Sequence, residues 1–243
     1  MILAAGLGTR LGPLTAEMPK ALISVGSVPA IERVARRLIA AGVDRLIINT
    51  HHFAEQIVDF VRERSGFGVD VAFSNEPGRP LETGGGLKAA APLLRRDQPF
   101  FLHNADVISD IPLERMYAAH LAGDAIATLA VMSRTSTRQL LFDEGGLLGR
   151  LDSGKGVRVE GRRMKGRVIE RAFAGIHVIS PDFLDRMSEE GAFSILDSYL
   201  RVIGEGRRID AFDADGYSWI DIGRPEQLAK AERMLGEQAG ERG

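Results

Sequence analysis

The chain has 243 residues, with 31 Lys and Arg against 33 Asp and Glu and a formal net charge of −2. This length can bury a full core, so we expect a single domain over residues 1–243 with a small lobe. The balanced charge excludes the basic field of a nucleic-acid-binding protein, and the lack of cysteine excludes disulfides and thiol catalysis. The apolar start is too short for a signal peptide and no run is long enough to cross a membrane, which predicts a cytoplasmic protein.

The first predicted element is a short buried strand over residues 1–5, which Gly6 and Gly8 bring to an end. Because glycine has no Cβ, the backbone N–H groups of such a loop can come close to a ligand and form a concave anion site. Arg10 and Lys20 add two fixed positive charges around the same turn, more than a single phosphate needs. The loop therefore predicts a site for a triphosphate or pyrophosphate.

Two other kinds of glycine loop match these residues less well. A Walker loop requires Gly-Lys followed by Ser or Thr, and none follows Gly8. A dinucleotide fingerprint requires a glycine where Leu11 stands and an acidic residue about 20 positions further on, where the chain has Lys20 and apolar residues. A tight turn between a strand and a helix is the remaining alternative for the glycines alone.

Helices and strands alternate after this loop. Helical periodicity covers residues 29–42 and 54–64, and apolar runs typical of buried strands cover residues 45–49 and 69–73. This alternation predicts an α/β fold with a mainly parallel sheet. His51 and His52 follow a strand at the position where such sheets bind ligands, but with no third metal ligand in view we expect a polar loop pair.

A second glycine-rich connection, SNEPGRPLETGGGL, covers residues 74–87. Its three glycines, Gly84 to Gly86, would weaken a helix interior, so we expect them at the start of a helix that runs to residue 94, with free N–H groups pointing outward to a ligand. Glu76 or Glu82 can accept a hydrogen bond from a base N–H, of either uracil or guanine. A glycine-rich surface turn is the alternative.

Asp106 directly follows a predicted buried strand over residues 100–104. A carboxylate at the carboxyl end of a strand and beside a phosphate loop suits Mg²⁺, which prefers hard oxygen ligands. His103 is expected to pack inside the strand. Near the end of the chain, Asp221 precedes a closing helix that is expected to reach about residue 235.

Glycines recur among charged residues and short strand-like pieces between residues 135 and 171, which predicts hairpins that form a mobile lid or small lobe. The lysines and arginines of this region either solvate its surface or face phosphates. Regular elements are expected on both sides of it: helices over residues 113–121, 181–187 and 195–205, and strands over residues 125–132 and 209–212.

The opening stretch resembles the signature of the sugar-1-phosphate nucleotidylyltransferases, L-A-[AG]-G-x-G-[TE]-R-[LM]-x-P-L-T followed by P-K. Residues 3–15 and 18–22 follow it, with Gly12 where Arg is common. The resemblance implies a Rossmann-like three-layer sandwich with a mixed, mostly parallel central sheet and a small β-rich lid over about residues 135–180. It also implies an Mg²⁺-dependent reaction of a nucleoside triphosphate with a sugar 1-phosphate, which gives a nucleotide sugar and pyrophosphate.

The resemblance also implies roles for individual residues. Catalysis would rest on Arg10 and Lys20, and Mg²⁺ would bind to Asp106 and Asp221. The sugar would contact Asn104, Glu170 and Gly175. The nucleotide would contact Leu3, Ala4, Ala5, Gly6, Gly8, Thr9, Arg10, Glu76, Glu82, Thr83, Gly84 and Gly85. The family's E-K-P motif before the sugar-binding segment is missing, with Glu170 standing alone, and Phe173 replaces an Asn that often precedes Gly175. No hexapeptide repeats follow, so no C-terminal β-helix domain is expected.

The string LETGGG most resembles the uridylyltransferases of this family, which favours UTP. A GTP-using mannose- or heptose-1-phosphate guanylyltransferase is the alternative within the family. A glycosyltransferase with a similar α/β core and a non-catalytic nucleotide-sugar sensor are alternatives of other classes. The expected partners are a nucleoside triphosphate and a sugar 1-phosphate, with no nucleic acid and no membrane, and the oligomeric state is open.

Overall fold

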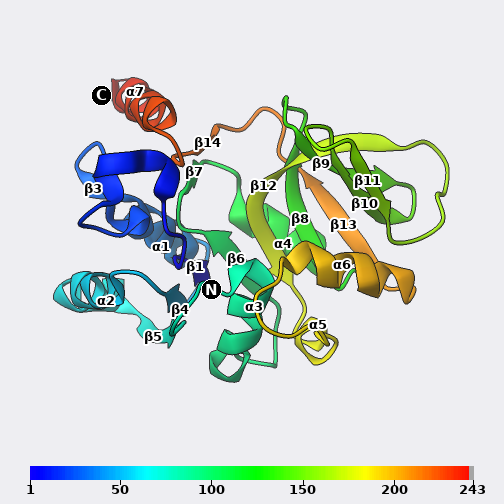
Figure 1. The fold of residues 1–243 in the computed structure, drawn as a ribbon, viewed down its shortest axis with the longest axis horizontal. Helices are drawn as coiled ribbons and strands as arrows, with labels where there is room; N and C mark the ends of the chain where they lie inside the picture. Colours follow the sequence, from blue (N-terminus) through cyan, green and yellow to red (C-terminus); the bar gives the residue numbers. More distant parts are fainter. Residues whose placement is uncertain (241–243) are drawn as a thin grey trace. The chain divides into compact units, whose positions relative to one another are not determined.

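The computed structural model describes residues 1–240, with side chains to residue 236. The chain divides into two units: unit 1 comprises residues 1–80, 103–111 and 218–240, and unit 2 comprises residues 81–102 and 112–217. Figure 1 labels the elements of both. Each unit is built from segments that are distant in the sequence, and the single domain expected over residues 1–243 stays a prediction.

The sheet of unit 1 is parallel, with the strand order β5, β4, β1, β6. Its strands are β1 (Ile2–Leu3), β4 (Arg45–Thr50), β5 (Asp70–Asn75) and the last two residues of β6 (Phe100–Asn104), which pair with β1. Leu3 lies opposite Asn49 on one side and Asn104 on the other. Because parallel strands end at one edge, the residues that follow them gather there. The alternation read from the sequence therefore places the glycine loop and Asp106 at the same edge.

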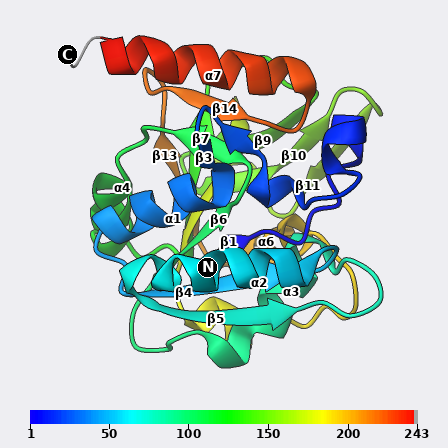
Figure 2. The ribbon, with the colours of Figure 1, turned by 90° about the vertical axis from the view of Figure 1, so that its left-hand side faces the viewer.

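Two amphipathic helices cover one face of this sheet, α1 (Ala30–Ala40) and α2 (Ala54–Glu63), as Figure 2 shows. In α1 the side chains of Ile31, Val34 and Leu38 recur at helical spacing and are buried. Arg64, just after α2, donates from Nε to Glu32 of α1 at 2.8 Å. Both predicted helices are thus confirmed, with ends within a few residues of those expected.

Most of the remaining elements of unit 1 contribute to one apolar cluster. Leu11, Ile108, Ile220 and Ala231 are among its buried members. Strands β7 (Val107–Ser109) and β14 (Trp219–Asp221) pair antiparallel, and so do β2 (Ser24–Val25) and β3 (Val28–Pro29). The 3-10 helices are η1 (Thr9–Thr15), η2 (Lys20–Leu22) and η3 (Ser65–Gly68), and the closing helix α7 spans Pro225–Gly240, beyond the predicted end near residue 235.

The sheet of unit 2 has the strand order β11, β10, β9, β12, β8, β13. Its neighbours pair antiparallel except β13 with β8. The strands are β8 (Ala127–Met132), β9 (Arg138–Asp143), β10 (Gly146–Asp152), β11 (Val157–Glu160), β12 (Ile169–Ile179) and β13 (Ile209–Asp213). The hairpins predicted between residues 135 and 171 are confirmed as β9, β10 and β11.

Unit 2 contains the helices α3 (Glu82–Ala90), α4 (Leu113–Leu121), α5 (Asp182–Asp185) and α6 (Ile195–Gly204). The helix predicted to reach residue 94 ends at Ala90 and continues as the 3-10 helix η4 (Ala91–Leu93), because Pro92 lacks the N–H that an α-helix would need there. The helix predicted over residues 181–187 is a single turn. The helix predicted over residues 113–121 is confirmed at both ends.

The fold class predicted from the sequence is confirmed: the protein is α/β, with a mixed, mostly parallel central sheet and a small antiparallel hairpin region. In the part of the chain that the structure describes, no helix combines the length and apolarity that a membrane span requires.

Candidate functional site

The glycine loop of unit 1 leads directly into the 3-10 helix η1, which was not predicted from the sequence. Gly8 has φ 66° and Gly12 has φ 57°, which glycine adopts without strain. Thr15 Oγ1 donates to the carbonyls of Gly8 at 3.0 Å and Gly12 at 3.2 Å. A Cβ at Gly8 would lie 2.8 Å from Thr15 and 3.0 Å from Lys20, whereas a Cβ at Gly6 would meet nothing within 4 Å. Gly8 therefore allows the loop to pack on Lys20, and Gly6 leaves open space.

Lys20 joins two carboxylates that lie far apart in the sequence. Its Nζ forms ion pairs with Oδ2 of Asp106 and, at 3.6 Å, with Oδ1 of Asp221. Lys20 is only 8% exposed. Pairing of β14 with β7 and the hydrogen bond from Ile222 N to Asp106 O at 3.0 Å hold the two aspartates side by side. The structure thus brings together three residues that the sequence analysis selected.

Gly223 also belongs to this cluster, although its sequence position alone did not indicate a role. Its N–H donates to Asp221 Oδ1 at 2.6 Å. A Cβ there would lie 2.7 Å from Asp221 Oδ1, 2.8 Å from Arg10 Nη2 and 3.1 Å from Lys20 Nζ. The charged ends of both cations therefore reach the same point. The Asp-x-Gly spacing was visible in the sequence, but only the packing shows why the glycine is needed.

Gly223→Ala is expected to lower kcat by about 10-fold while leaving stability nearly unchanged. The added Cβ displaces the side-chain ends of Asp221, Arg10 and Lys20 rather than backbone, and a shift of about 1 Å at reacting groups can cost up to about 10²-fold. Steady-state kinetics and thermal unfolding measure the two effects. The matched control is Gly236→Ala in α7, where a Cβ meets nothing within 4 Å. Normal turnover of Gly223→Ala would contradict the role given to this glycine.

A second polar cluster lies at the carboxyl ends of β1, β4 and β5. Asn49 accepts from Ala4 N at 2.6 Å and donates to Glu76 Oε1 at 2.6 Å. Glu76 was expected to accept from a base, but its side chain holds Asn49 and the residue is 1% exposed. His51 Nδ1 contacts Glu76 O at 2.8 Å, in line with its expected loop role. The sequence analysis missed Asn49, because a polar residue inside an apolar strand carries no motif.

His103 packs inside β6 as predicted. It is 1% exposed, and burial lowers the pKa of its imidazole to about 4. Its Nδ1 lies 2.8 Å from the carbonyl oxygen of Asn104. Asn104, a predicted sugar contact, ends β6 and lies opposite Leu3. Among the predicted nucleotide contacts, Ala4 is buried, whereas Gly6, Thr9 and Arg10 are exposed.

The glycines of residues 84–86 in unit 2 serve a different purpose from the one expected. Gly84 N and Gly85 N donate to Phe193 O at 2.9 and 3.3 Å, so the expectation of free outward N–H groups is wrong for these two. A Cβ at Gly84 would lie 2.3 Å from the Phe193 ring, and one at Gly85 would lie 2.4 Å from Gly191 O. The close approach that these glycines permit is to residues 191–195, because α3 packs there directly.

The other predicted residues of unit 2 lie on two elements, α3 and β12. Thr83 Oγ1 accepts from Ile195 N at 3.0 Å, and Glu82 begins α3 with φ 59°. Glu170 is exposed on β12, opposite Leu141. Gly175 has φ 78° at the bulge of β12, where the pairing with β8 shifts register. The contacts of these residues with nucleotide or sugar stay predictions.

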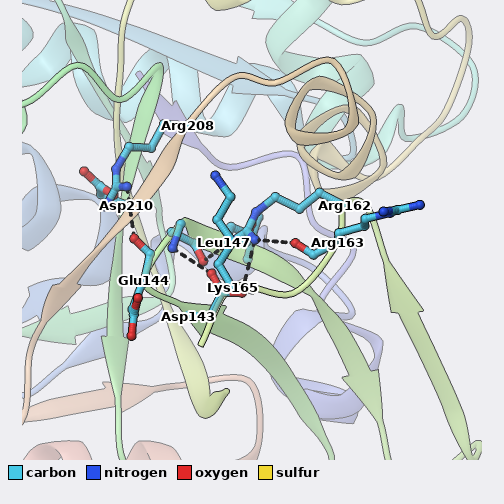
Figure 3. A network of polar contacts seen from close by, with 10 residues as sticks. Asp143, Glu144, Leu147, Arg162, Arg163, Lys165, Arg208 and Asp210 are labelled. Atoms are coloured by element: carbon cyan, nitrogen blue, oxygen red, sulfur yellow. Dashed lines mark hydrogen bonds and ion pairs between the residues drawn. The ribbon is translucent and has the colours of Figure 1, made fainter. Parts of the chain in front are cut away.

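Arg162, one of the basic residues of the hairpin region, is part of the unit's framework. Its guanidinium forms an ion pair with Asp143, whose side chain is fully buried, and donates to Leu147 O at 2.9 Å (Figure 3). Asp143 also accepts from the N–H of Gly145 at 2.7 Å and of Lys165 at 2.6 Å. These hydrogen bonds, the one from Arg162 above all, lower the pKa of Asp143 to about 2. The basic residues of this region were expected either to solvate its surface or to face phosphates. Arg162 does neither, because it holds Asp143 inside the unit.

Comparison with known proteins identifies the family. The family model described as nucleotidyl transferase matches residues 1–142, which include the glycine loop, Lys20 and Asp106. The chain belongs to the nucleotidyl transferase family. N-acetylmuramate alpha-1-phosphate uridylyltransferase of Caulobacter vibrioides is 33% identical over 98% of this chain and 96% of its own length. The resemblance to sugar-1-phosphate nucleotidylyltransferases found in the sequence is thus confirmed at the level of the family.

Two further proteins are similar to this chain, one in sequence and one in fold. Mannose-1-phosphate guanyltransferase of Candida albicans is 32% identical over 94% of this chain, which spans only 62% of that protein. A crystal structure of a putative glucose-1-phosphate thymidylyltransferase from Bacillus anthracis superimposes with a TM-score of 0.80 over 96% of this chain and 93% of the other, at 17% identity. At that identity the likeness shows a shared nucleotidyltransferase fold, while the nucleotides and sugars named differ among the three proteins.

Proposed function

We propose that this member of the nucleotidyl transferase family joins a nucleoside triphosphate to a sugar 1-phosphate and releases pyrophosphate. The observation that carries the proposal is the convergence of Lys20, Asp106, Asp221 and the Arg10 guanidinium at Gly223, beside the glycine loop. Two cations and two carboxylates beside an anion-binding loop suit a site that neutralises phosphates during transfer.

The reaction needs no side-chain base. A phosphate monoester with a second pKa of about 6 is already largely ionised at neutral pH, so its oxygen can attack the α-phosphorus directly. The protein has to align the two phosphates and stabilise the charge that moves to the leaving pyrophosphate. Arg10 and the loop N–H groups would hold the triphosphate and the leaving group. Lys20 would hold the α-phosphoryl group and the sugar phosphate.

Mg²⁺ is the metal ion that these residues suit. The carboxylates of Asp106 and Asp221 converge on one ammonium group, which marks the point between them as a place for a cation. No third His, Cys, Asp or Glu forms a metal cluster with them within the described residues. Mg²⁺ is commonly bound through one or two carboxylates together with substrate phosphates and water. When bound, the ion would neutralise phosphate oxygens, while Asp106 and Asp221 fix its position.

UTP is the triphosphate that we propose, with N-acetylmuramate 1-phosphate as the sugar substrate. The support is the uridylyltransferase of Caulobacter vibrioides, which matches this chain over nearly the whole length of both proteins. The guanyltransferases offer GTP and mannose 1-phosphate as the second candidate pair, and this chain spans 62% of the Candida albicans enzyme. We propose a cytoplasmic location and a lid role for residues 135–171 on the sequence argument alone.

Pyrophosphate release tests the proposal. The purified chain, with Mg²⁺, is mixed with UTP, GTP and other triphosphates in combination with the 1-phosphates of N-acetylmuramate, N-acetylglucosamine, mannose, glucose and heptose. We expect the fastest release with UTP and N-acetylmuramate 1-phosphate. Release of a nucleoside diphosphate from a nucleotide sugar would instead indicate a glycosyltransferase. Tight nucleotide binding without turnover of any pair would indicate a sensor.

A further inference from the structure

We propose that Asn49 is a positioning residue of the nucleotide site, which sets the glycine loop against the end of β5 through Glu76. The proposal rests on the proposed function, because it assigns a role in binding the triphosphate. It differs from the expectation that Glu76 accepts from the base, and it gives that carboxylate a partner within the protein.

The hydrogen-bond chain from Ala4 through Asn49 to Glu76 is short and buried. Both bonds measure 2.6 Å, and the three residues are 7%, 2% and 1% exposed. Ala4 N–H can only donate and a carboxylate can only accept, so the orientation of the Asn49 amide is fixed by its partners. The side-chain amide of Asn supplies an acceptor oxygen and a donor nitrogen from a single planar group. Asn49 is therefore matched to both neighbours.

The hydrogen bonds of Asn49 link the strands beyond the last backbone pairs of the sheet. Leu3 lies opposite Asn49 in the ladder of β1 and β4, and Ala4 is the next residue of β1's chain. On the other side, Thr50 lies opposite Asn75, and Glu76 N donates to Thr50 O at 2.8 Å. The side chains of Asn49 and Glu76 thus cross-link the carboxyl ends of β1, β4 and β5 where the ladder from β4 to β1 has ended.

This cross-link determines where the glycine loop begins. Gly6 is exposed, and a Cβ there would meet nothing within 4 Å, so the loop has no packing of its own at that residue. After Gly6, the carbonyl of Gly8 is held by Thr15 Oγ1 at 3.0 Å; before it, the hydrogen bond from Ala4 holds the residue two positions earlier. Losing the hydrogen bond from Ala4 would let the loop N–H groups shift relative to the phosphates, and we expect the affinity for the triphosphate to fall by about 10-fold.

Single and double substitutions of Asn49 and Glu76 test the proposal. Asn49→Asp places a second carboxylate against Glu76 and removes the donor, so we expect the Kd for UTP to rise by about 10-fold or more. Glu76→Gln keeps an acceptor for Asn49, so we expect a change within about 3-fold. The double variant Asn49→Asp/Glu76→Gln reverses the bond, because the new amide at position 76 can donate to the new carboxylate at position 49, which still accepts from Ala4 N. We expect it to recover UTP binding to within about 3-fold of the wild type.

Calorimetric binding of UTP without sugar phosphate, and the split between kcat and the KM of each substrate, are the readouts. We expect the effect on the KM for UTP to exceed that on the KM for the sugar phosphate. Asn75→Asp is the matched control, because it adds the same charge one residue from Glu76 at an exposed position. Should Asn49→Asp fail to fold, Asn49→Ala removes both hydrogen bonds without adding a charge and is expected to raise the Kd for UTP by a similar factor.

Two outcomes would overturn the proposal. If Glu76→Gln alone abolishes UTP binding and the double variant does not recover it, Glu76 contacts the nucleotide directly. If the Asn49 variants bind UTP like the wild type, the cross-link does not position the loop. Failure of the proposed function is distinct, because it would show in the wild type as UTP binding without pyrophosphate release, and the Kd values of the variants would still test the role of Asn49.

Discussion

Replacing Lys20 with alanine is expected to lower kcat by about 10²-fold or more, since removing one preorganised donor from a site that stabilises developing charge costs that much. Lys20 also neutralises Asp106 and Asp221, which would otherwise repel each other. Arg10→Ala is expected to show a similar loss, because its guanidinium reaches the same point at Gly223. Single-turnover kinetics at saturating substrate measure the chemical step.

Folding has to be separated from catalysis in these variants. Lys20 is buried, so Lys20→Met, which keeps most of the side-chain stem, accompanies Lys20→Ala, and thermal unfolding is recorded for each. Lys155→Ala, at an exposed lysine of the hairpin region, is the control for loss of a positive charge. A folded Lys20 or Arg10 variant with near-normal kcat would contradict the roles assigned to the pair.

Arg162→Ala is expected to lower the free energy of unfolding by about 3 kcal/mol, because it leaves the buried Asp143 carboxylate without its partner. The neighbouring, exposed Arg163 is the control, and Arg163→Ala is expected to change stability by no more than about 0.5 kcal/mol. Urea unfolding at pH 7 compares the two variants with the wild type. Equal stability of both variants would show that the ion pair does not hold the hairpins.

The same ion pair predicts a pH dependence of stability. The folded-state pKa of Asp143 lies near 2, below its ordinary value. A carboxyl with a lowered pKa stabilises the fold above its unfolded-state pKa, and this contribution is lost as the pH falls from about 4 toward 2. Asp143→Asn lacks the contribution at pH 7, so its unfolding free energy should fall less steeply than that of the wild type over this pH range.

The sequence predicted the regular parts of the fold well because their periodicity is local. The buried face of α1, with Ile31, Val34 and Leu38, and the unbroken apolar run of β4 both follow from short-range patterns. The division of the chain was not predicted, because residues 103–111 and 218–240 join unit 1 only through contacts distant in sequence. The 3-10 helix after Gly8 depends on Thr15 Oγ1 closing the loop, which no pattern of apolar residues reports.

The sequence predicted those residues of the candidate site whose role follows from their charge and position. It did not predict those whose role depends on packing. Lys20, Asp106 and Asp221 were selected from charge and position, and they lie together. No role was predicted for Gly223 or Asn49, since one is needed only for space and the other for a buried amide bond. The glycines of residues 84–86 were predicted to approach a ligand, but they allow α3 to pack on residues 191–195. A sequence does not show this packing.

Isotope transfer tests the proposed reaction most directly. The sugar 1-phosphate is prepared with ¹⁸O in its phosphate oxygens and incubated with the chain, Mg²⁺ and unlabelled UTP. If a phosphate oxygen of the sugar attacks the α-phosphorus, mass spectrometry will find all of the label in the nucleotide sugar and none in the released pyrophosphate. Label in free inorganic phosphate, with none in a nucleotide sugar, would show that the linkage between sugar and phosphate is cleaved instead, and it would contradict nucleotidyl transfer.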